Sequence, residues 1–237
     1  MLRTDSRQNN EMRQVNITTN VQKYAEGSVI IENGNTQIIC AVSVDEGVPT
    51  FLKGKGKGWV TAEYSMLPRS THTRISRTRA SGGRAKEIQR LIGRSMRAVT
   101  DLSLLGERTV TIDCDVIQAD GGTRTAAITG SYVAFELACR ELISRGDLQN
   151  TVLKYPIAAT SVGFVSGTLM LDLTYEEDSR ADVDFNVVMA GNGQFVEIQA
   201  SGEEAVFNYQ TLSDALELAK KGIDSLIKAQ SSALDNQ

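Results

Sequence analysis

Histidine and proline are scarce in this sequence, and both shortages narrow what the chain can be. Its 237 residues include 1 His, 3 Pro and 23% charged side chains, and nothing in that composition predicts disorder. The single histidine, His72, leaves little room for Ser-His-Asp or Cys-His nucleophilic chemistry. Any catalysis is therefore expected to rest on carboxylates, arginines and backbone groups.

Cysteine is scarce as well. Cys40, Cys114 and Cys139 are odd in number, widely spaced and set in apolar stretches, and none belongs to a Cys-x-x-Cys pair. This pattern predicts buried, reduced thiols and argues against a zinc site.

Long apolar runs are missing too: none reaches the ~18 residues that a membrane helix needs. The opening residues Met1–Arg7 are charged and polar where a signal peptide carries an apolar segment. Both observations predict a cytoplasmic protein with no membrane partner.

The net charge of −4 argues against a nucleic-acid binder, but the charges are unevenly distributed. Residues 51–100 carry twelve basic and two acidic side chains, a local charge of +10, which leaves −14 on the remainder. Such segregation costs self-repulsion and favours binding of a polyanion over a merely solvated basic loop. The basic residues are Lys53, Lys55, Lys57, Arg69, Arg74, Arg77, Arg79, Arg84, Lys86, Arg90, Arg94 and Arg97.

Hydrophobic periodicity and turn residues predict hairpins followed by helices, once in each half of the chain. The predicted strands lie at 28–32, 36–42, 109–117, 182–189 and 194–198, with a further pair within 159–174. The predicted helices span about 85–103, 124–144 and 211–229, and Thr211 with Asp214 is interpreted as a capping-box pair of the last one. No linker separates the halves. The sequence therefore predicts an α+β, two-layer single domain over 1–237 with weak internal duplication.

A glycine-rich segment, Asp120-Gly121-Gly122-Thr123-Arg124-Thr125, joins a predicted strand to the second helix. Glycines let the backbone approach a ligand, a helix start offers unpaired N–H groups to an anion, and Arg124 adds a planar fork. The segment predicts a phosphate site, although an ordinary capped turn has the same composition. Arg84, after Gly82-Gly83, is a second anion clamp or a surface charge.

Acidic residues cluster at 176–184. Asp182 and Asp184 fall on one side of a predicted strand, and Asp178 lies on the turn before it. Grouped carboxylates without histidine suit Mg²⁺ or Mn²⁺. A solvated acidic turn is the alternative.

Several of these motifs together resemble the ribonuclease PH family, in order and over nearly the whole chain. The matching runs are Phe51–Trp59, Glu63–Arg74, Glu87–Ser95, Asp113–Thr125, and Glu177–Ser179 followed by Asp184.

This resemblance implies a phosphate-dependent 3′→5′ exoribonuclease that trims precursor tRNA as a ring-shaped hexamer, a trimer of dimers. By the same resemblance, Arg84, Gly122, Thr123 and Arg124 bind the attacking inorganic phosphate. Asp178 and Asp184 serve catalysis and hold the metal, and Arg69, Arg74 and Arg77 hold RNA.

The sequence departs from the usual family pattern at Ser6, at Ala200 and in a shorter loop between Arg74 and Arg84, which bears on RNA grip or subunit contacts. Two alternatives remain at this stage. A non-catalytic RNA-binding ring subunit tends to lack the phosphate arginines or the acids, and both are present here. A metal-dependent hydrolytic nuclease needs the acids alone and leaves the phosphate segment without a role.

Overall fold

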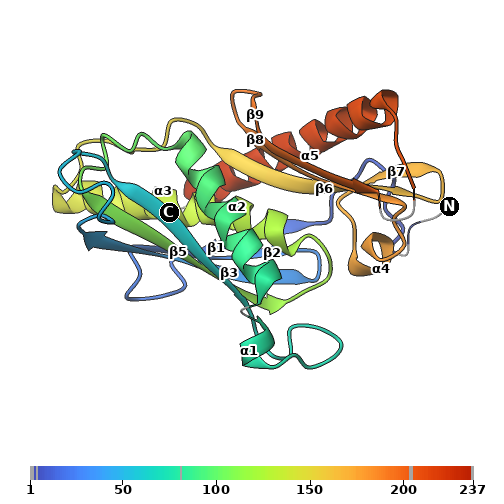
Figure 1. Ribbon diagram of the computed structural model, residues 1–237, viewed down its shortest axis with the longest axis horizontal. Helices are drawn as coiled ribbons and strands as arrows, with labels where there is room; N and C mark the ends of the chain where they lie inside the picture. Colours follow the sequence, from blue (N-terminus) through green and yellow to red (C-terminus); the bar gives the residue numbers. More distant parts are fainter. Residues whose placement is uncertain (1–2, 4, 81, 203–204, 236–237) are drawn as a thin grey trace.

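The computed structural model describes residues 3, 5–80, 82–202 and 205–235, with the backbone alone at 79 and 80. Two β-sheets alternate with helices from the bottom to the top of the view in Figure 1. The first sheet has the order β1-β2-β3-β5-β4 and is antiparallel except for the parallel pair β4–β5. Its strands are β1 Val15–Thr19, β2 Gly27–Asn33, β3 Thr36–Glu46, β4 Trp59–Met66 and β5 Arg108–Gln118.

The second sheet is antiparallel throughout, with the order β7-β6-β8-β9. Its strands are β6 Ile157–Val165, β7 Thr168–Leu171, β8 Val183–Ala190 and β9 Phe195–Gly202. The helices are α1 Arg77–Ala80, α2 Gly83–Val99, α3 Thr123–Arg145, α4 Tyr175–Asp178 and α5 Tyr209–Asp235.

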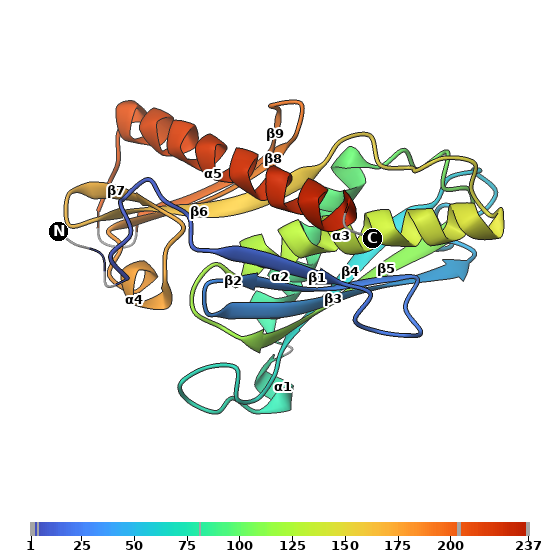
Figure 2. The same cartoon turned by 180° about the vertical axis from the view of Figure 1, so that it is seen from behind.

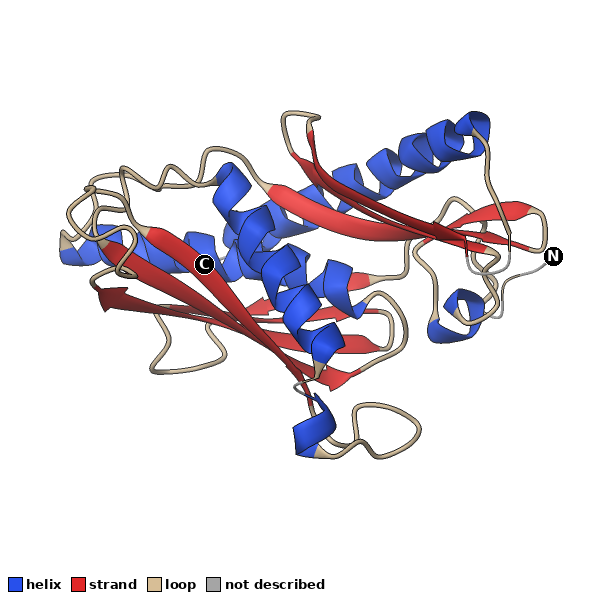
Figure 3. Cartoon of the chain, viewed as in Figure 1, coloured by secondary structure: helices blue, strands red, loops and turns tan. Residues whose placement is uncertain are grey.

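Strand β6 shows how the layers stack. Ile157 and Ala159 pack into the core that the first sheet shares with α2 and α3, whereas Ala158 and Val162 face the core under α5. This alternation follows from the two-residue period of a strand. The second sheet thus has α3 on one face and α5 on the other (Figure 3).

The predicted α+β fold is confirmed, and each half contributes a layer of strands covered by a helix. The two halves share one core cluster, in which Val188 and Leu234 join side chains of the first sheet. The single domain remains a prediction, and this shared core supports it.

The three predicted hairpins are all present, and the first turns at Gly34, whose φ of 57° suits the two-residue loop. Strands β1 and β4 and the short helices α1 and α4 were not predicted. All three cysteines are free and buried, as predicted. Among the described residues, no helix is long and apolar enough to cross a membrane.

The predicted capping pair of the last helix is wrong. Helix α5 begins at Tyr209, and the Asn208 carbonyl accepts the first helical hydrogen bond from Leu212 N at 3.1 Å. Asn208 Oδ1 accepts from Thr211 N at 2.9 Å, which makes Asn208 the N-cap. Asp214 instead accepts from Gln210 Nε2 one turn earlier. The helix starts before the point at which its apolar stripe becomes readable.

Candidate active site

The glycine loop, residues 120–123, connects β5 to α3. Gly121 and Gly122 have φ angles of 76° and 67°, the left-handed region that glycine adopts without strain. Gly122 is the N-cap of α3, and it has no side chain with which to cap this helix start. The first-turn N–H groups of a 23-residue helix therefore keep their positive potential for a ligand.

The glycine loop lies directly against the acid turn, residues 172–178. A Cβ atom on Gly121 would stand 2.4 Å from the carbonyl oxygen of Leu173, so only glycine fits. Asp120 Oδ1 accepts a hydrogen bond from Tyr175 N at 3.2 Å, at the start of α4. Two segments whose bonded residues lie 55 positions apart in sequence thus form one unit.

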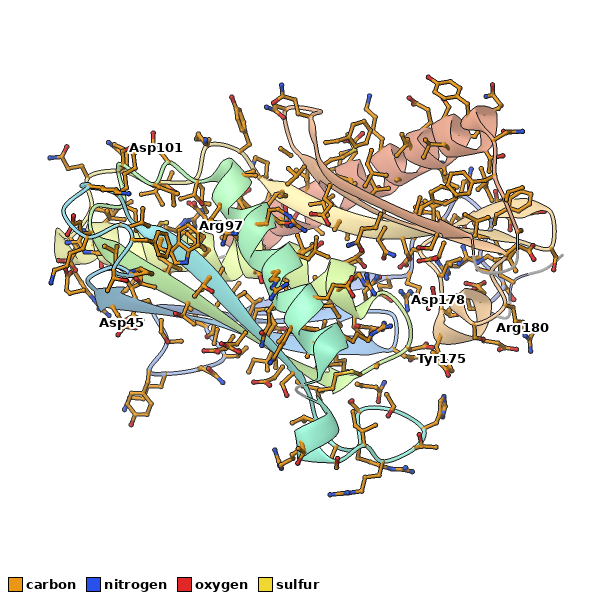
Figure 4. The ribbon with its side chains drawn as sticks, viewed as in Figure 1. Asp45, Arg97, Asp101, Tyr175, Asp178 and Arg180 are labelled. Carbon is orange, nitrogen blue, oxygen red and sulfur yellow. The ribbon has the colours of Figure 1, made fainter. Side chains whose placement is uncertain are left out.

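A capping box builds the acid turn. Thr174 Oγ1 accepts from Glu177 N at 3.4 Å, and Glu177 Oε2 accepts from Thr174 N at 3.0 Å. This short helix ends at Asp178, which points from α4 toward the body of the molecule, whereas Arg180 points away (Figure 4). Asp184 follows on β8, and its carboxylate accepts from Asn186 Nδ2 at 3.2 Å.

A cavity of about 1430 Å³ lies where these segments meet. Its lining includes six residues predicted as site residues: Arg84, Gly122, Thr123, Arg124, Asp178 and Asp184. Asp182 lines it too, as the predicted acidic cluster requires. The basic and the acidic halves of the predicted site therefore face one another across a single cavity.

Two arginines supply the positive side of the cavity. Arg84 lies in the first turn of α2. Arg124 donates from Nη1 to Gln199 Oε1 at 2.8 Å and reaches Glu87 Oε1 at 3.4 Å. Nearby, the Tyr64 hydroxyl donates to Thr123 Oγ1 at 2.9 Å. Burial raises the pKa of Tyr64, although Arg84 and Arg124 act in the opposite direction, so Tyr64 stays a neutral donor beside the two arginines.

The three predicted RNA-binding arginines lie elsewhere. Arg69 and Arg74 belong to the connection after β4, and Arg77 opens α1; all three are exposed, and none lines the cavity. Arg69 donates to the carbonyl of His72 at 2.7 Å. Their loop projects beside α1 from the edge of the first sheet (Figure 1), while Thr71, His72 and Thr73 within it line the cavity.

Two family models match this chain: "3' exoribonuclease family, domain 1" over residues 11–141 and "domain 2" of the same family over residues 155–222. The chain belongs to the 3′ exoribonuclease family. It is 55% identical to ribonuclease PH of Bacillus cereus (strain G9842), over 98% of this chain and 97% of that protein. It is also 55% identical to ribonuclease PH of Syntrophomonas wolfei, over 99% of each. The prediction of an exoribonuclease of the ribonuclease PH type, with inorganic phosphate as co-substrate, is thereby confirmed.

Two solved structures share the fold. Rice Rrp46 superposes with a TM-score of 0.80 at 19% identity, over 98% of this chain and 100% of that chain. The Archaeoglobus fulgidus exosome with RNA bound to the active site superposes with a TM-score of 0.80 at 22% identity, over 95% and 91%. At such identities the likeness shows the fold alone.

The sequence did not predict the residues that hold the cavity-lining residues in place. Arg13 and Asp172 are buried and bonded to one another next to the glycine loop, and Gln199 holds Arg124. None belongs to a short motif. An aspartate in an otherwise apolar stretch, such as Asp172 between Leu171 and Leu173, is the one signal that would have pointed to such a pair.

Proposed function

We propose that this cavity carries out phosphorolysis of precursor tRNA from its 3′ end. An oxygen of inorganic phosphate attacks the last phosphodiester in line, a new P–O bond forms, and the bond to the 3′-oxygen of the preceding nucleotide breaks. The products are a nucleoside diphosphate and an RNA shorter by one residue. The enzyme works in the cytoplasm as a hexameric ring, a trimer of dimers.

One observation carries the proposal: the uncapped start of α3, with Arg84 and Arg124 beside it, opens into the cavity that Asp178 and Asp184 line. Phosphate is an anion that attacks without a general base at neutral pH, which fits a cavity whose one histidine lies on a loop. The amides of the α3 start, Thr123 and the two arginines bind and orient the nucleophile.

Asp178 and Asp184 face this phosphate position and are suited to a hard divalent cation. The described residues contain no group of three or more His, Cys, Asp and Glu side chains arranged around a metal. Two carboxylates nevertheless fit Mg²⁺ or Mn²⁺, because Mg²⁺ usually keeps several waters and takes one or two protein carboxylates. Asp178 and Asp184 are the residues that would hold the ion, and its charge would neutralise charge on the transferring phosphoryl group.

The RNA enters past the loop that carries Arg69, Arg74 and Arg77. These exposed arginines contact backbone phosphates without reading bases. His72 and Tyr175 line the entrance with ring centroids 6.1 Å apart, a surface suited to stacking of a nucleotide base.

Two rival functions fit the cavity less well. A non-catalytic ring subunit needs neither the phosphate arginines nor the acids, and both meet here. A hydrolytic nuclease needs the acids, but it gives no role to an uncapped helix start flanked by Arg84 and Arg124.

The test is to incubate the protein with a 3′-extended tRNA precursor and Mg²⁺, with and without phosphate, and to identify the released nucleotide. We expect nucleoside diphosphates only when phosphate is present. Arg124→Ala and Asp184→Ala should each lower the rate by at least about a hundredfold. Arg145→Ala, an exposed arginine at the far end of α3 paired with Glu141, is the matched control and should retain full activity.

Nucleoside monophosphates released without phosphate would instead establish hydrolysis. Binding of RNA without any release would favour the non-catalytic subunit.

A further inference from the structure

The segment before β1 runs beside β7 and α4 on the side of the site away from α2 (Figure 2). Two of its arginines, Arg3 and Arg13, are 4% and 6% exposed, unusual burial for a permanently charged side chain. Each pairs with a buried acid of the acid turn, Arg3 with Glu177 and Arg13 with Asp172. We call these four residues the N-terminal frame.

Arg13 joins the acid turn to the glycine loop. Its guanidinium makes a two-pronged contact with Asp172, Nε to Oδ2 at 2.9 Å and Nη2 to Oδ1 at 2.7 Å. The remaining Nη1 donates to the carbonyl of Asp120 at 2.5 Å, and Nη2 reaches the carbonyl of Gly121 at 3.4 Å. Both carbonyls lie immediately before the start of α3, so Arg13 fixes where the phosphate-binding amides begin.

Arg3 fixes the other side of the site. It contacts both carboxylate oxygens of Glu177 at 2.7 Å and donates to the carbonyls of Leu171 at 2.8 Å and Asp172 at 2.9 Å. Glu177 closes the capping box and directly precedes Asp178. Arg3 therefore sets the orientation of the helical turn that presents Asp178 to the cavity.

Asp172 is the residue of the acid turn that both arginines contact: Arg3 donates to its carbonyl and Arg13 to its carboxylate. Its φ of 55° is uncommon for a residue with a side chain. Three further donors hold its carboxylate besides the Arg13 guanidinium: Arg13 N at 2.8 Å, Asn33 Nδ2 at 2.9 Å and Arg7 Nη1 at 3.5 Å. Burial raises the pKa of Asp172, but the hydrogen bonds and the charge of Arg13, together with the charge of Arg7, hold the pKa below its ordinary value.

Stability alone is a poor explanation for this arrangement. Buried ion pairs are often replaced by apolar side chains of similar volume with no loss of stability. An apolar side chain could not bond at once to the Asp172 carboxylate of the acid turn and to the Asp120 carbonyl of the glycine loop, as Arg13 does. The guanidinium can, because it presents five donors in one rigid plane.

We infer that Arg13 and Arg3 are positioning residues: Arg13 sets the place of the phosphate-binding helix start, and Arg3 sets the place of Asp178 relative to it. The inference rests on the proposed function, which places phosphate at the α3 start and a metal at Asp178. The arginines of the N-terminal segment therefore set the distance between the bound phosphate and the metal.

The test replaces each arginine by lysine, which keeps the charge and loses the fork. Arg13→Lys should weaken binding of inorganic phosphate alone about tenfold, measured by calorimetry, and raise KM for phosphate by the same factor. Arg3→Lys should leave phosphate binding unchanged, lower kcat, and weaken Mn²⁺ binding about tenfold in electron paramagnetic resonance. If the arginines had a merely structural role, the two variants would not differ in this way, one losing phosphate affinity and the other losing Mn²⁺ affinity.

Leu105→Ala is the control for lost stability, because Leu105 is fully buried near Gly58, at the end of β4 away from the cavity. It should lower Tm without changing phosphate or Mn²⁺ affinity. If Arg13→Lys does not fold, Asn33→Ala removes one donor to Asp172 and should weaken phosphate binding in the same direction, by a smaller factor.

Lysine variants that lose thermal stability but bind phosphate and Mn²⁺ as the unmodified protein does would overturn the inference. That result leaves the proposed function intact as long as the unmodified protein phosphorolyses RNA. An unmodified protein that releases no diphosphate would refute the proposed function instead, whatever the lysine variants bind.

Discussion

Gly121 is the residue at which the glycine loop and the acid turn come closest, and its role is open to a direct test. Gly121→Ala places a methyl group 2.4 Å from the Leu173 carbonyl oxygen at a φ of 76°. The free energy of unfolding should fall by about 3 kcal/mol, because a backbone clash adds to the left-handed strain. The loop must also move, so kcat/KM should fall at least about tenfold. Urea denaturation and steady-state phosphorolysis measure the two effects.

Gly193→Ala separates the two causes. Gly193 has a φ of 84° in the β8–β9 turn, with nothing within 4 Å of an added Cβ. This variant should lose only about 1 kcal/mol of stability and keep its activity. Equal losses of stability and activity in both variants would show that the close approach of Gly121 to Leu173 contributes to neither.

For single residues, the sequence predicts those that line the cavity better than those that support the lining from behind. Arg84, Arg124, Asp178 and Asp184 stand out because they lie in motifs or local clusters, and all four line the cavity. Arg13 bonds to Asp172 across 159 positions. No local pattern predicts such a pair, because only the folded chain brings the two together.

The start of α5 is the clearest discrepancy at the level of an element, and it yields a prediction. Asn208→Ala removes the acceptor of Thr211 N and should lower the free energy of unfolding by about 1 kcal/mol, equivalent to roughly 2–4 °C in Tm. Asp214→Ala should stay within about 0.5 kcal/mol, because its carboxylate accepts a hydrogen bond from Gln210 at the surface of the molecule. Thermal denaturation of both variants decides between the two caps. A larger loss in Asp214→Ala would restore the interpretation from the sequence.

The elements that the sequence does predict have strong local signals. The hairpin turning at Gly34 follows from turn chemistry, and α3 from a long apolar segment that both sheets bury. Strand β4 was missed although Val60, Ala62 and Tyr64 are buried in alternation, because the small Ala62 at its centre makes this apolar stripe weak in the sequence. Helix α4 has only 4 residues, too few for a helical period to be visible.

Across the whole molecule, the basic segment of the sequence is also a separate region of the fold. The basic segment 51–100 spans β4, the loop that carries Arg69 and Arg74, α1 and α2, which lie together at one edge of the first sheet (Figure 1). The acidic remainder includes Asp178 at the end of α4 and Asp184 on strand β8 of the second sheet. An RNA that follows the basic edge is therefore led to the cavity between the two sheets, where the opposite charges meet.

This arrangement predicts how RNA binding depends on salt. Affinity for a 3′-extended tRNA precursor should fall steeply as salt rises, despite the net charge of −4. Arg69→Ala, Arg74→Ala and Arg77→Ala should each reduce the slope of log K against log salt by about 1. None lines the cavity, so binding of inorganic phosphate alone should not change. Arg145→Ala, on the opposite end of α3, should keep the full slope, and fluorescence anisotropy at several salt concentrations measures all four variants. Slopes identical to that of the unmodified protein would place the RNA away from this loop, and the charge segregation would then serve another contact.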